Sequence, residues 1–274
     1  DDQGWRIEIK QLPELTKVGS HRAATVIGKN TGKYDGKPHG GFYTQAQCKE
    51  IIAYAADRNI EIIPEIDLPG HMLAALAAYP EMGCTGGPYE VGQIWGVSSD
   101  VLCAGNPKTY AFIDKVLGEV AQLFPGKYFH IGGDECPKTR WKTCPKCQGI
   151  IQEKQLQAEG KHTAEERLQS YVIRYAEKTL ARYGKRIIGW DEILEGGLAP
   201  TATVMSWRGE TGGIEAAQSG HDVVMSPNTY LYFDYYQAKD ASQEPLAIGG
   251  YLPLERVYSY EPMPCLLYTS DAAD

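Results

Sequence analysis

Short runs of β-branched and other apolar residues alternate along this chain with longer amphipathic segments. The pattern of a buried strand occurs five times, over residues 60–66, 128–131, 186–190, 203–207 and 222–225. The longer segments between them carry apolar residues at the three- and four-residue spacing of helices that pack on a sheet. Because no antiparallel hairpin signal separates these runs, the pattern predicts an α/β fold with a parallel sheet covered by helices.

Three of the helices have distinct start signals. Thr44 and Thr163 each begin a capping box, which Gln47 and Glu166 complete three residues later. Asn106 precedes a proline, the arrangement of an N-cap followed by proline at the first helical position. These signals place helix starts directly after the strands or the loops that follow them.

Polar and aromatic residues arrive where the expected strands end. Asp67 follows the first run, Asp134 and Glu135 the second, Trp190 ends the third and Trp207 the fourth. Barrel enzymes build their sites from several strand ends on one face. No GxGxxG or GxxxxGK[ST] follows any strand, which excludes the nucleotide-binding form of an open sheet. We therefore predict a (β/α)8 TIM barrel, of which roughly six units are present.

The sharpest motif is FHIGGDE, residues 129–135. Its two glycines let the backbone bend, and neighbouring side chains on a regular strand point to opposite faces. Asp134 and Glu135 can therefore reach one pocket only where the strand ends. An adjacent Asp-Glu pair alone is more often a solvated turn. Acids, the histidine His71 and tryptophans at successive strand ends favour function, and aromatic walls with interleaved carboxylates suit a sugar.

In this order, the motifs DDQGWRIEI, EIDLPGH, HIGGDE, GWDEI, SWRG and YLYFDYYQ resemble family 20 glycoside hydrolases, the β-N-acetylhexosaminidases, and look closest to bacterial members. The resemblance covers residues 1–264. It implies a (β/α)8 barrel and the exo-acting, retaining release of terminal β-linked GlcNAc or GalNAc from glycans. In that family the substrate's own acetamido group attacks C1 and forms an oxazolinium intermediate. The resemblance implies no cofactor and no metal.

The resemblance also implies roles for single residues. Glu135 matches the general acid and base, for which it should be buried beside Asp134 and aromatic walls. Asp134 matches the residue that orients the acetamido group and stabilises the oxazolinium. Trp190 and Trp207 match two walls of the pocket that binds the acetamido group, and Tyr232 matches the residue that bonds to the acetamido oxygen. Asp234 matches a ligand of the sugar hydroxyls. Asp1 and His71 match a polar pair behind the acid, with His130 nearby.

Compared with the family, the chain should lack the first barrel strand before Asp1 and the last strand after Pro264. Residues 265–274, CLLYTSDAAD, resemble a translated sequencing adapter, so we expect only residues 1–264 to be native, as part of a (β/α)8 catalytic domain. Such a truncated barrel would expose two sheet edges, and we expect the isolated chain to aggregate or to be inactive.

Composition excludes several other classes of protein. Hydrophobic residues make up 43% and charged residues 23% of the 274, as in globular proteins. With 27 basic and 35 acidic residues the net charge is −8, and no basic run suggests binding to nucleic acid or to an anionic membrane. The longest apolar stretch, 72–79, is too short to span a bilayer. We expect a periplasmic or secreted protein whose signal region precedes this chain.

Six of the seven cysteines lie outside the adapter-like tail. Cys84 and Cys103 flank a glycine-rich loop and could staple it. Cys144 and Cys147 form a CxxC that could hold zinc, but no paired ligands are visible along the chain. The spacing alone favours structural disulfides or free thiols.

Two functions of other classes compete with the hydrolase interpretation. A carbohydrate-binding barrel without chemistry would keep the aromatic residues but would not need both Asp134 and Glu135. A metal-dependent barrel hydrolase could use His71, His130 and the same two acids, but its usual HxH signature is absent. The preference between GlcNAc and GalNAc stays open.

Overall fold

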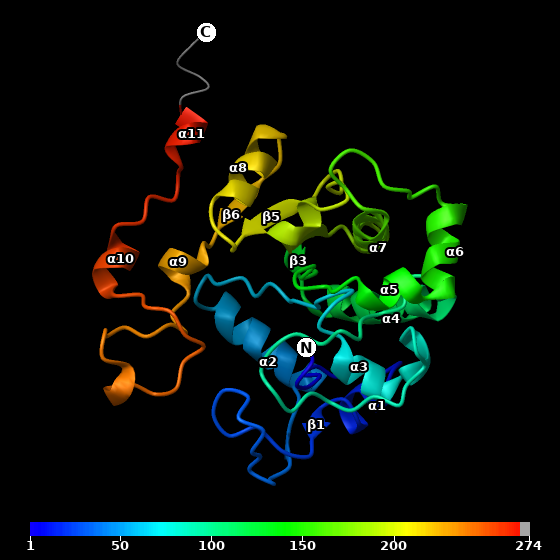
Figure 1. The fold of residues 1–274 in the computed structure, drawn as a ribbon, viewed down its shortest axis with the longest axis horizontal. Helices are drawn as coiled ribbons and strands as arrows, with labels where there is room; N and C mark the ends of the chain where they lie inside the picture. Colours follow the sequence, from blue (N-terminus) through cyan, green and yellow to red (C-terminus); the bar gives the residue numbers. More distant parts are fainter. Residues whose placement is uncertain (269–274) are drawn as a thin grey trace. The chain divides into compact units, whose positions relative to one another are not determined.

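The computed structural model describes residues 1–268 (Figure 1). They divide into two compact units, the first over Asp1–Ala202 and the second beginning at Thr203. In the first unit the elements are α1 (Glu14–Lys17), β1 (His21–Arg22), β2 (His39–Gly40), α2 (Gln45–Ala56), α3 (Leu73–Ala78), η1 (Pro80–Met82), α4 (Pro107–Leu123), β3 (Tyr128–His130), α5 (Thr139–Thr143), α6 (Pro145–Glu153), α7 (Ala164–Ala181), β4 (Arg186–Trp190) and η2 (Asp191–Leu194). In the second they are β5 (Thr203–Ser206), α8 (Thr211–Gln218), β6 (Val223–Met225), α9 (Asn228–Leu231), η3 (Ala241–Gln243), α10 (Leu254–Tyr258) and α11 (Cys265–Tyr268).

Parallel pairing organises the first unit. β3 and β4 run parallel, with His130 opposite Ile188. The expected strand over 60–66 is not a regular strand; it meets β3 through a single parallel bridge between Glu65 and His130. Pro64 explains this difference, because proline has no N–H for a ladder. Its carbonyl still accepts the amide of His130 at 2.9 Å, so the segment lies beside β3 as expected.

An antiparallel pair, β1 with β2, also occurs, with His21 opposite Gly40. The pair lies before residue 60, outside the five runs from which the parallel sheet was predicted. Each strand has only two residues and sixteen others separate them, so neither alternation nor a tight turn marks the pair.

The helix starts are confirmed. In α2, Thr44 Oγ1 accepts the amide of Gln47 at 3.2 Å, and Gln47 Oε1 accepts the amide of Thr44 at 2.9 Å. Thr163 and Glu166 form the same reciprocal pair at 3.2 and 2.7 Å. Asn106 accepts the amide of Lys108 at 3.1 Å and caps α4.

Helices α4 and α7 pack against each other in the first unit (Figure 1). A polar contact between them centres on Asp114 of α4, which accepts the hydroxyl of Tyr175 at 2.7 Å and that of Thr179 at 2.8 Å. The buried apolar residues are Phe112, Ile113, Val116, Leu117 and Val120 on α4 and Leu168, Val172, Ile173, Ala176 and Leu180 on α7. Because α7 also packs on β4, this core fixes the strand ends that carry the candidate site.

In the second unit, β5 and β6 also pair in parallel, with Ser206 opposite Met225. α8 packs on both strands through Gly213, where a Cβ would lie 3.1 Å from Val223 and 3.2 Å from Ser206. The expected strands 203–207 and 222–225 are thus present, each one residue shorter. Of the expected non-native tail 265–274, residues 269–274 lie outside the described part of the chain.

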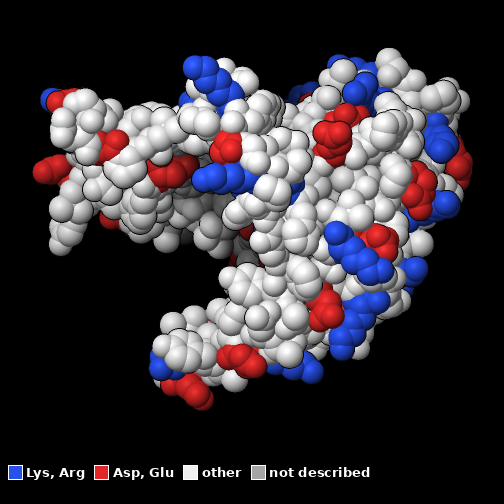
Figure 2. Space-filling view, turned by 90° about the horizontal axis from the view of Figure 1, so that it is seen from below, with Lys and Arg blue, Asp and Glu red and all other residues white. Residues whose placement is uncertain are grey.

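The surface mixes both signs of charge. On the face drawn in Figure 2, basic and acidic side chains alternate, and neither sign covers a continuous area. Within residues 1–268, none of the helices combines the length and the apolar character needed to cross a bilayer.

Candidate active site

The chain leaves β3 through two glycines at positions where any side chain would be strained. Gly132 and Gly133 have φ of +65° and +94°, in the region that favours glycine. A Cβ on Gly132 would overlap the carboxylate of Asp67, and one on Gly133 would lie 2.6 Å from Cγ2 of Ile193. This close packing turns the backbone sharply at the strand end and sets the direction of the two acids that follow.

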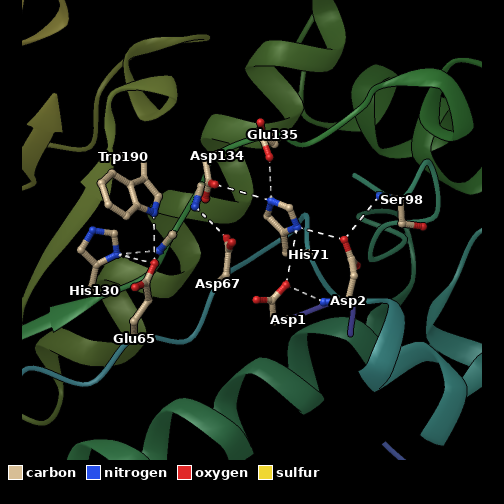
Figure 3. A network of polar contacts seen from close by, with 12 residues as sticks. Asp1, Asp2, Glu65, Asp67, His71, Ser98, His130, Asp134, Glu135 and Trp190 are labelled. Carbon is tan, nitrogen blue, oxygen red and sulfur yellow. Dashed lines mark hydrogen bonds and ion pairs between the residues drawn. The ribbon is translucent and has the colours of Figure 1, made fainter. Parts of the chain in front are cut away.

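Those two acids meet at one histidine. Nε2 of His71 lies 3.2 Å from Oε2 of Glu135 and 3.5 Å from Oδ2 of Asp134 (Figure 3). His71 and Glu135 have φ of +50° and +42°, a conformation uncommon for residues other than glycine. Backbone strain of this kind persists where surrounding structure enforces it, often at functional sites. The structure therefore brings Asp134, Glu135 and His71 together, as the sequence predicted.

Asp2 holds the other side of the imidazole. Its Oδ2 lies 2.9 Å from Nδ1 of His71, and its Oδ1 accepts the amide of Leu73 at 2.9 Å. Asp1, which was expected to pair with His71, lies 3.9 Å from the same nitrogen and is exposed. The direct partner is thus the neighbouring residue of the DDQGW motif. The motif contains both acids, and nothing in the linear sequence distinguishes the inner one.

The carboxylates keep His71 positively charged. Burial alone would lower the pKa of His71, but hydrogen bonds with Asp134 and Asp2 and the nearby charge of Asp67 raise the pKa to about 11. For Asp2 the bond with His71 outweighs burial and lowers the pKa. With a proton on each ring nitrogen, His71 can donate to Asp2 on one side and to the acids at the end of β3 on the other.

Asp67 and Asp134 form a second coupled pair. Burial and the charge of Asp134 raise the pKa of Asp67 well above its ordinary value, while Asp67 Oδ1 accepts the amide of Gly133 at 3.0 Å. For Asp134, burial is outweighed by bonds with His71 and Asp67, and the pKa is lowered. Of the two carboxyl groups, Asp67 therefore holds a proton more readily than Asp134. Oδ1 of Asp134 is buried and has no hydrogen-bond partner within the described residues.

Glu65 orients Trp190, a contact that the sequence does not indicate. Oε1 of Glu65 accepts the indole N–H of Trp190 at 3.0 Å and lies 3.3 Å from Nδ1 of His130 (Figure 3). The rings of His130 and Trp190 lie 4.9 Å apart. Because the side chain of His130 is only 8% exposed, its place is behind Trp190 rather than at an open surface.

A buried glutamine supports the glycine turn from α7. Nε2 of Gln169 donates to the carbonyl of Gly133 at 2.7 Å, and Lys138 donates to Oε1 of Gln169. Gln169 is 1% exposed. In the sequence it is one polar residue on a helix, and only the tertiary fold shows its role.

Glu135 differs from the expected burial. Its side chain is 41% exposed, while that of Asp134 is 18% exposed. The expectation of a buried Glu135 is therefore wrong in this structure, because the residue lies beyond the end of β3, after the glycine turn. Asp134 is the shielded member of the pair.

Two of the remaining predicted residues contact each other in the second unit. The rings of Trp207 and Tyr232 stack with centroids 6.0 Å apart and planes 15° apart. The amide of Asn228, the first residue of α9, donates to the carbonyl of Trp207 at 2.8 Å and holds this arrangement. Asp234 follows on an exposed segment.

Comparison with known protein families shows which family this chain belongs to. Residues 1–273 match the sequence model of "Glycosyl hydrolase family 20, catalytic domain". The chain belongs to this family. A β-hexosaminidase of Porphyromonas gingivalis is 56% identical over 265 residues, and one of Vibrio furnissii is 42% identical over 265 residues. Each alignment covers 96% of this chain but only 32% and 42% of the relative, so the chain spans less than half of either protein.

Solved structures of family 20 enzymes agree. A crystal structure of a β-N-acetylhexosaminidase matches with a TM-score of 0.82 and 30% identity, covering 96% of this chain and 54% of that one. An exo-β-N-acetylglucosaminidase from Vibrio harveyi in complex with N-acetylglucosamine matches with a TM-score of 0.76 and 35% identity, covering 97% and 41%. This chain thus has the fold of a TIM-barrel catalytic domain. The predictions of the family and of the fold class are confirmed.

Proposed function

We propose that the protein carrying this chain is an exo-acting, retaining β-N-acetylhexosaminidase that uses substrate-assisted catalysis. One observation carries the proposal: Asp134 and Glu135, consecutive residues, both lie within 3.5 Å of Nε2 of His71. In the two-carboxylate retaining scheme, the acid and the nucleophile act from opposite sides of the glycosidic bond. Two acids from one strand end do not bracket the bond in this way. The nucleophile then comes from the substrate, whose acetamido oxygen attacks C1.

Glu135 and Asp134 have different tasks in this reaction. Glu135, the exposed member, protonates the glycosidic oxygen as the bond from C1 to that oxygen breaks and the acetamido oxygen bonds to C1. It later takes a proton from the water that opens the oxazolinium, and the product keeps its anomeric configuration. Asp134, ionised and shielded, accepts the acetamido N–H and stabilises the positive charge of the intermediate.

His71 and the aromatic residues position these groups. His71 donates to the acids and is held in turn by Asp2. We assign the sugar contacts to the residues that match the family pattern: Trp190 and Trp207 as walls of the acetamido pocket, Tyr232 as donor to the acetamido oxygen, Asp234 as acceptor from sugar hydroxyls, and His130 as support for Trp190. The substrates are glycans with terminal β-GlcNAc or β-GalNAc, and the reaction needs no cofactor.

We also propose a periplasmic or secreted location. Glycans with terminal N-acetylhexosamines are polymers or conjugates found mainly outside the cytoplasm, so an exo-acting enzyme meets them there. Cell fractionation of a host that expresses the complete protein tests this assignment. Activity confined to the cytoplasmic fraction would contradict it.

Hydrolysis of p-nitrophenyl glycosides by the complete protein tests the function. The β-GlcNAc or β-GalNAc substrate should be cleaved, while the matched β-glucoside, which lacks an acetamido group, should not. A thiazoline mimic of the oxazolinium should inhibit competitively. Equal turnover of the glucoside would show an enzyme nucleophile, and sugar binding without turnover of any of the three would favour the binding-module alternative.

A further inference from the structure

Four cysteines of the first unit gather at one point, away from the residues assigned to the sugar. Cys84 follows η1, Cys103 precedes α4, and Cys144 and Cys147 lie at the start of α6. Their four sulfur atoms all lie within 4.8 Å of one another. Cys103, Cys144 and Cys147 are buried, and Cys84 is half-buried. The CxxC whose partners were not visible in the sequence thus faces a second pair.

The distances between the sulfurs fit a tetrahedron around one metal ion. They are 3.8 Å for Cys84 to Cys147, 3.7 Å for Cys103 to Cys144, and 3.7 Å for Cys103 to Cys147. In a regular tetrahedron with Zn–S bonds of about 2.3 Å, the sulfurs stand about 3.8 Å apart. Four cysteines that include a CxxC are a common ligand set of closed, structural zinc sites.

The same distances do not favour two disulfides. A disulfide joins two sulfurs at about 2.05 Å and leaves each without a further partner. Here Cys103 is equally close to Cys144 and Cys147, and Cys147 is nearly as close to Cys84. The sulfurs therefore form one cluster rather than two separate pairs.

We propose that Cys84, Cys103, Cys144 and Cys147 bind one structural zinc ion. Hydrogen bonds of the surrounding chain hold the cluster in place: the amide of Cys103 donates to the carbonyl of Met82 at 2.8 Å, and the indole of Trp141 donates to the carbonyl of Leu102 at 2.9 Å. Gly105 packs so closely on the backbone between Cys144 and Cys147 that a Cβ there would overlap Lys146.

The segment that carries Cys144 and Cys147 is basic, which suits a thiolate site. Zinc with four thiolates carries a net charge of −2. Residues 136–147 contain four basic residues and no acidic one, Lys138, Arg140, Lys142 and Lys146, of which Arg140 is paired with Asp100. Cys144 is also the N-cap of α6, and Cys147 lies in its first turn, where the helix dipole favours negative charge. Of the four ligands, Cys84 is the one that is partly open to solvent.

The ion would tie the loop 84–103 to the segment that follows Glu135. Other contacts join the same two parts: Arg140 pairs with Asp100 at 2.8 Å, and the loop reaches the candidate site where the amide of Ser98 donates to Asp2 at 3.4 Å. Zinc therefore has a structural role here, and it fixes the loop behind the Asp2–His71 pair.

Metal analysis of the complete protein, purified without a histidine tag and without added metal, tests the site. Inductively coupled plasma mass spectrometry should find one zinc per chain, and X-ray absorption at the zinc edge should show four sulfurs at about 2.3 Å. After unfolding in EDTA without reductant, alkylation should modify every cysteine. The proposal would be overturned by any of three results. The metal could be iron in place of zinc, the cysteines could resist alkylation because they form disulfides, or a chain with free thiols could gain no zinc on titration.

Cysteine variants test the ligands. Cys144→Ser should lower the zinc content at least five-fold and speed up amide hydrogen exchange in residues 96–104. Cys48→Ser is the matched control, because Cys48 is also buried but lies outside the cluster, and it should keep one zinc. If Cys144→Ser does not fold, the metal content and alkylation of the unmutated protein still decide the question. Unchanged zinc in a folded Cys144→Ser protein would contradict the assignment.

Discussion

Nε2 of His71 lies 3.2 Å from Oε2 of Glu135, although 64 positions separate the two residues in the chain. The contact links the end of the segment beside β3 to the end of β3 itself. One oxygen of Glu135 thus has a charged donor. This contact fixes the direction of the carboxyl group that we propose as the general acid.

Glu135→Gln tests the general acid. The amide keeps the shape of the side chain and its acceptor for His71 but has no proton to transfer. Since general acid–base catalysis is worth about 10²–10⁴-fold, kcat on a natural glycan with a poor leaving group should fall by that factor. Cleavage of an activated aryl glycoside should fall less in the glycosylation step, because its leaving group needs little protonation.

Steady-state kinetics on both substrates measure this difference. Glu50→Gln, an identical change at an exposed position of α2, should leave both rates unchanged. A small and equal loss on both substrates in Glu135→Gln would show that another residue is the acid.

Asp134→Asn tests the stabilisation of the intermediate. Asparagine keeps an acceptor for the acetamido N–H but removes the negative charge that faces the oxazolinium. Loss of a group that acts on transition-state charge costs about 10²–10³-fold in kcat, so kcat should fall by more than KM rises. The thiazoline mimic should bind the variant more weakly than it binds the unmutated enzyme.

Inhibition constants for the thiazoline in both proteins measure the second effect. Asp57→Asn, at the exposed C-cap of α2, makes the same change away from the site and should alter neither quantity. Equal thiazoline affinity in the Asp134→Asn and unmutated proteins would exclude a charge contact between Asp134 and the intermediate.

The His71→Asn variant tests whether the positive charge of the imidazole stabilises the folded protein. Asparagine tolerates the positive φ of this position. The pKa of His71 is raised to about 11 in the folded state, above its ordinary value of 6.5. Protonation therefore stabilises the fold fully below about pH 6.5. This stabilisation decreases as pH rises from there and is lost as pH passes the folded pKa.

Urea unfolding at pH 6, 7.5 and 9 should show this trend. The difference in unfolding free energy between the unmutated protein and His71→Asn should be largest at the lowest of these pH values and should shrink at the highest. His39→Asn, on the exposed strand β2, should show no difference at any of them. A difference that grows with pH would mean that His71 is neutral in the folded protein.

Local signals predicted the parts of the fold that local interactions determine. The capping boxes at Thr44 and Thr163 formed as expected because each needs only residues three positions apart. Asp134 and Glu135 were recognised because a strand, two glycines and two acids are contiguous. The segment 60–66 was misjudged because its apolar pattern outweighed the single missing N–H of Pro64.

Contacts between distant segments could not be predicted. The choice of Asp2 over Asp1, the bond from Trp190 to Glu65 and the support of Gly133 by Gln169 all depend on packing between residues at least 36 positions apart. The cysteine cluster is the clearest case. The pair Cys84 and Cys103 is separated from the pair Cys144 and Cys147 by at least 41 positions. The spacing within one pair therefore does not predict that the other pair lies beside it.

Gly133→Ala tests how tightly the turn before the two acids is packed. An alanine here must adopt φ of +94° and would place its Cβ 2.6 Å from Cγ2 of Ile193. The backbone cost is about 1–2 kcal/mol, and forcing an extra methyl into a packed site adds about 1–3 kcal/mol. Urea unfolding of the variant and the unmutated protein measures the sum of the two costs.

Gly184→Ala separates the backbone cost from the steric one. Gly184 also has a positive φ, +70°, but a Cβ added there would meet no atom within 4 Å, so this variant should lose only the backbone contribution. Ile193→Leu removes the branch at Cβ, so Gly133→Ala combined with Ile193→Leu should be more stable than the sum of the two single losses predicts. Equal destabilisation by Gly133→Ala and Gly184→Ala, with no coupling to Ile193, would show that steric contact does not set the turn.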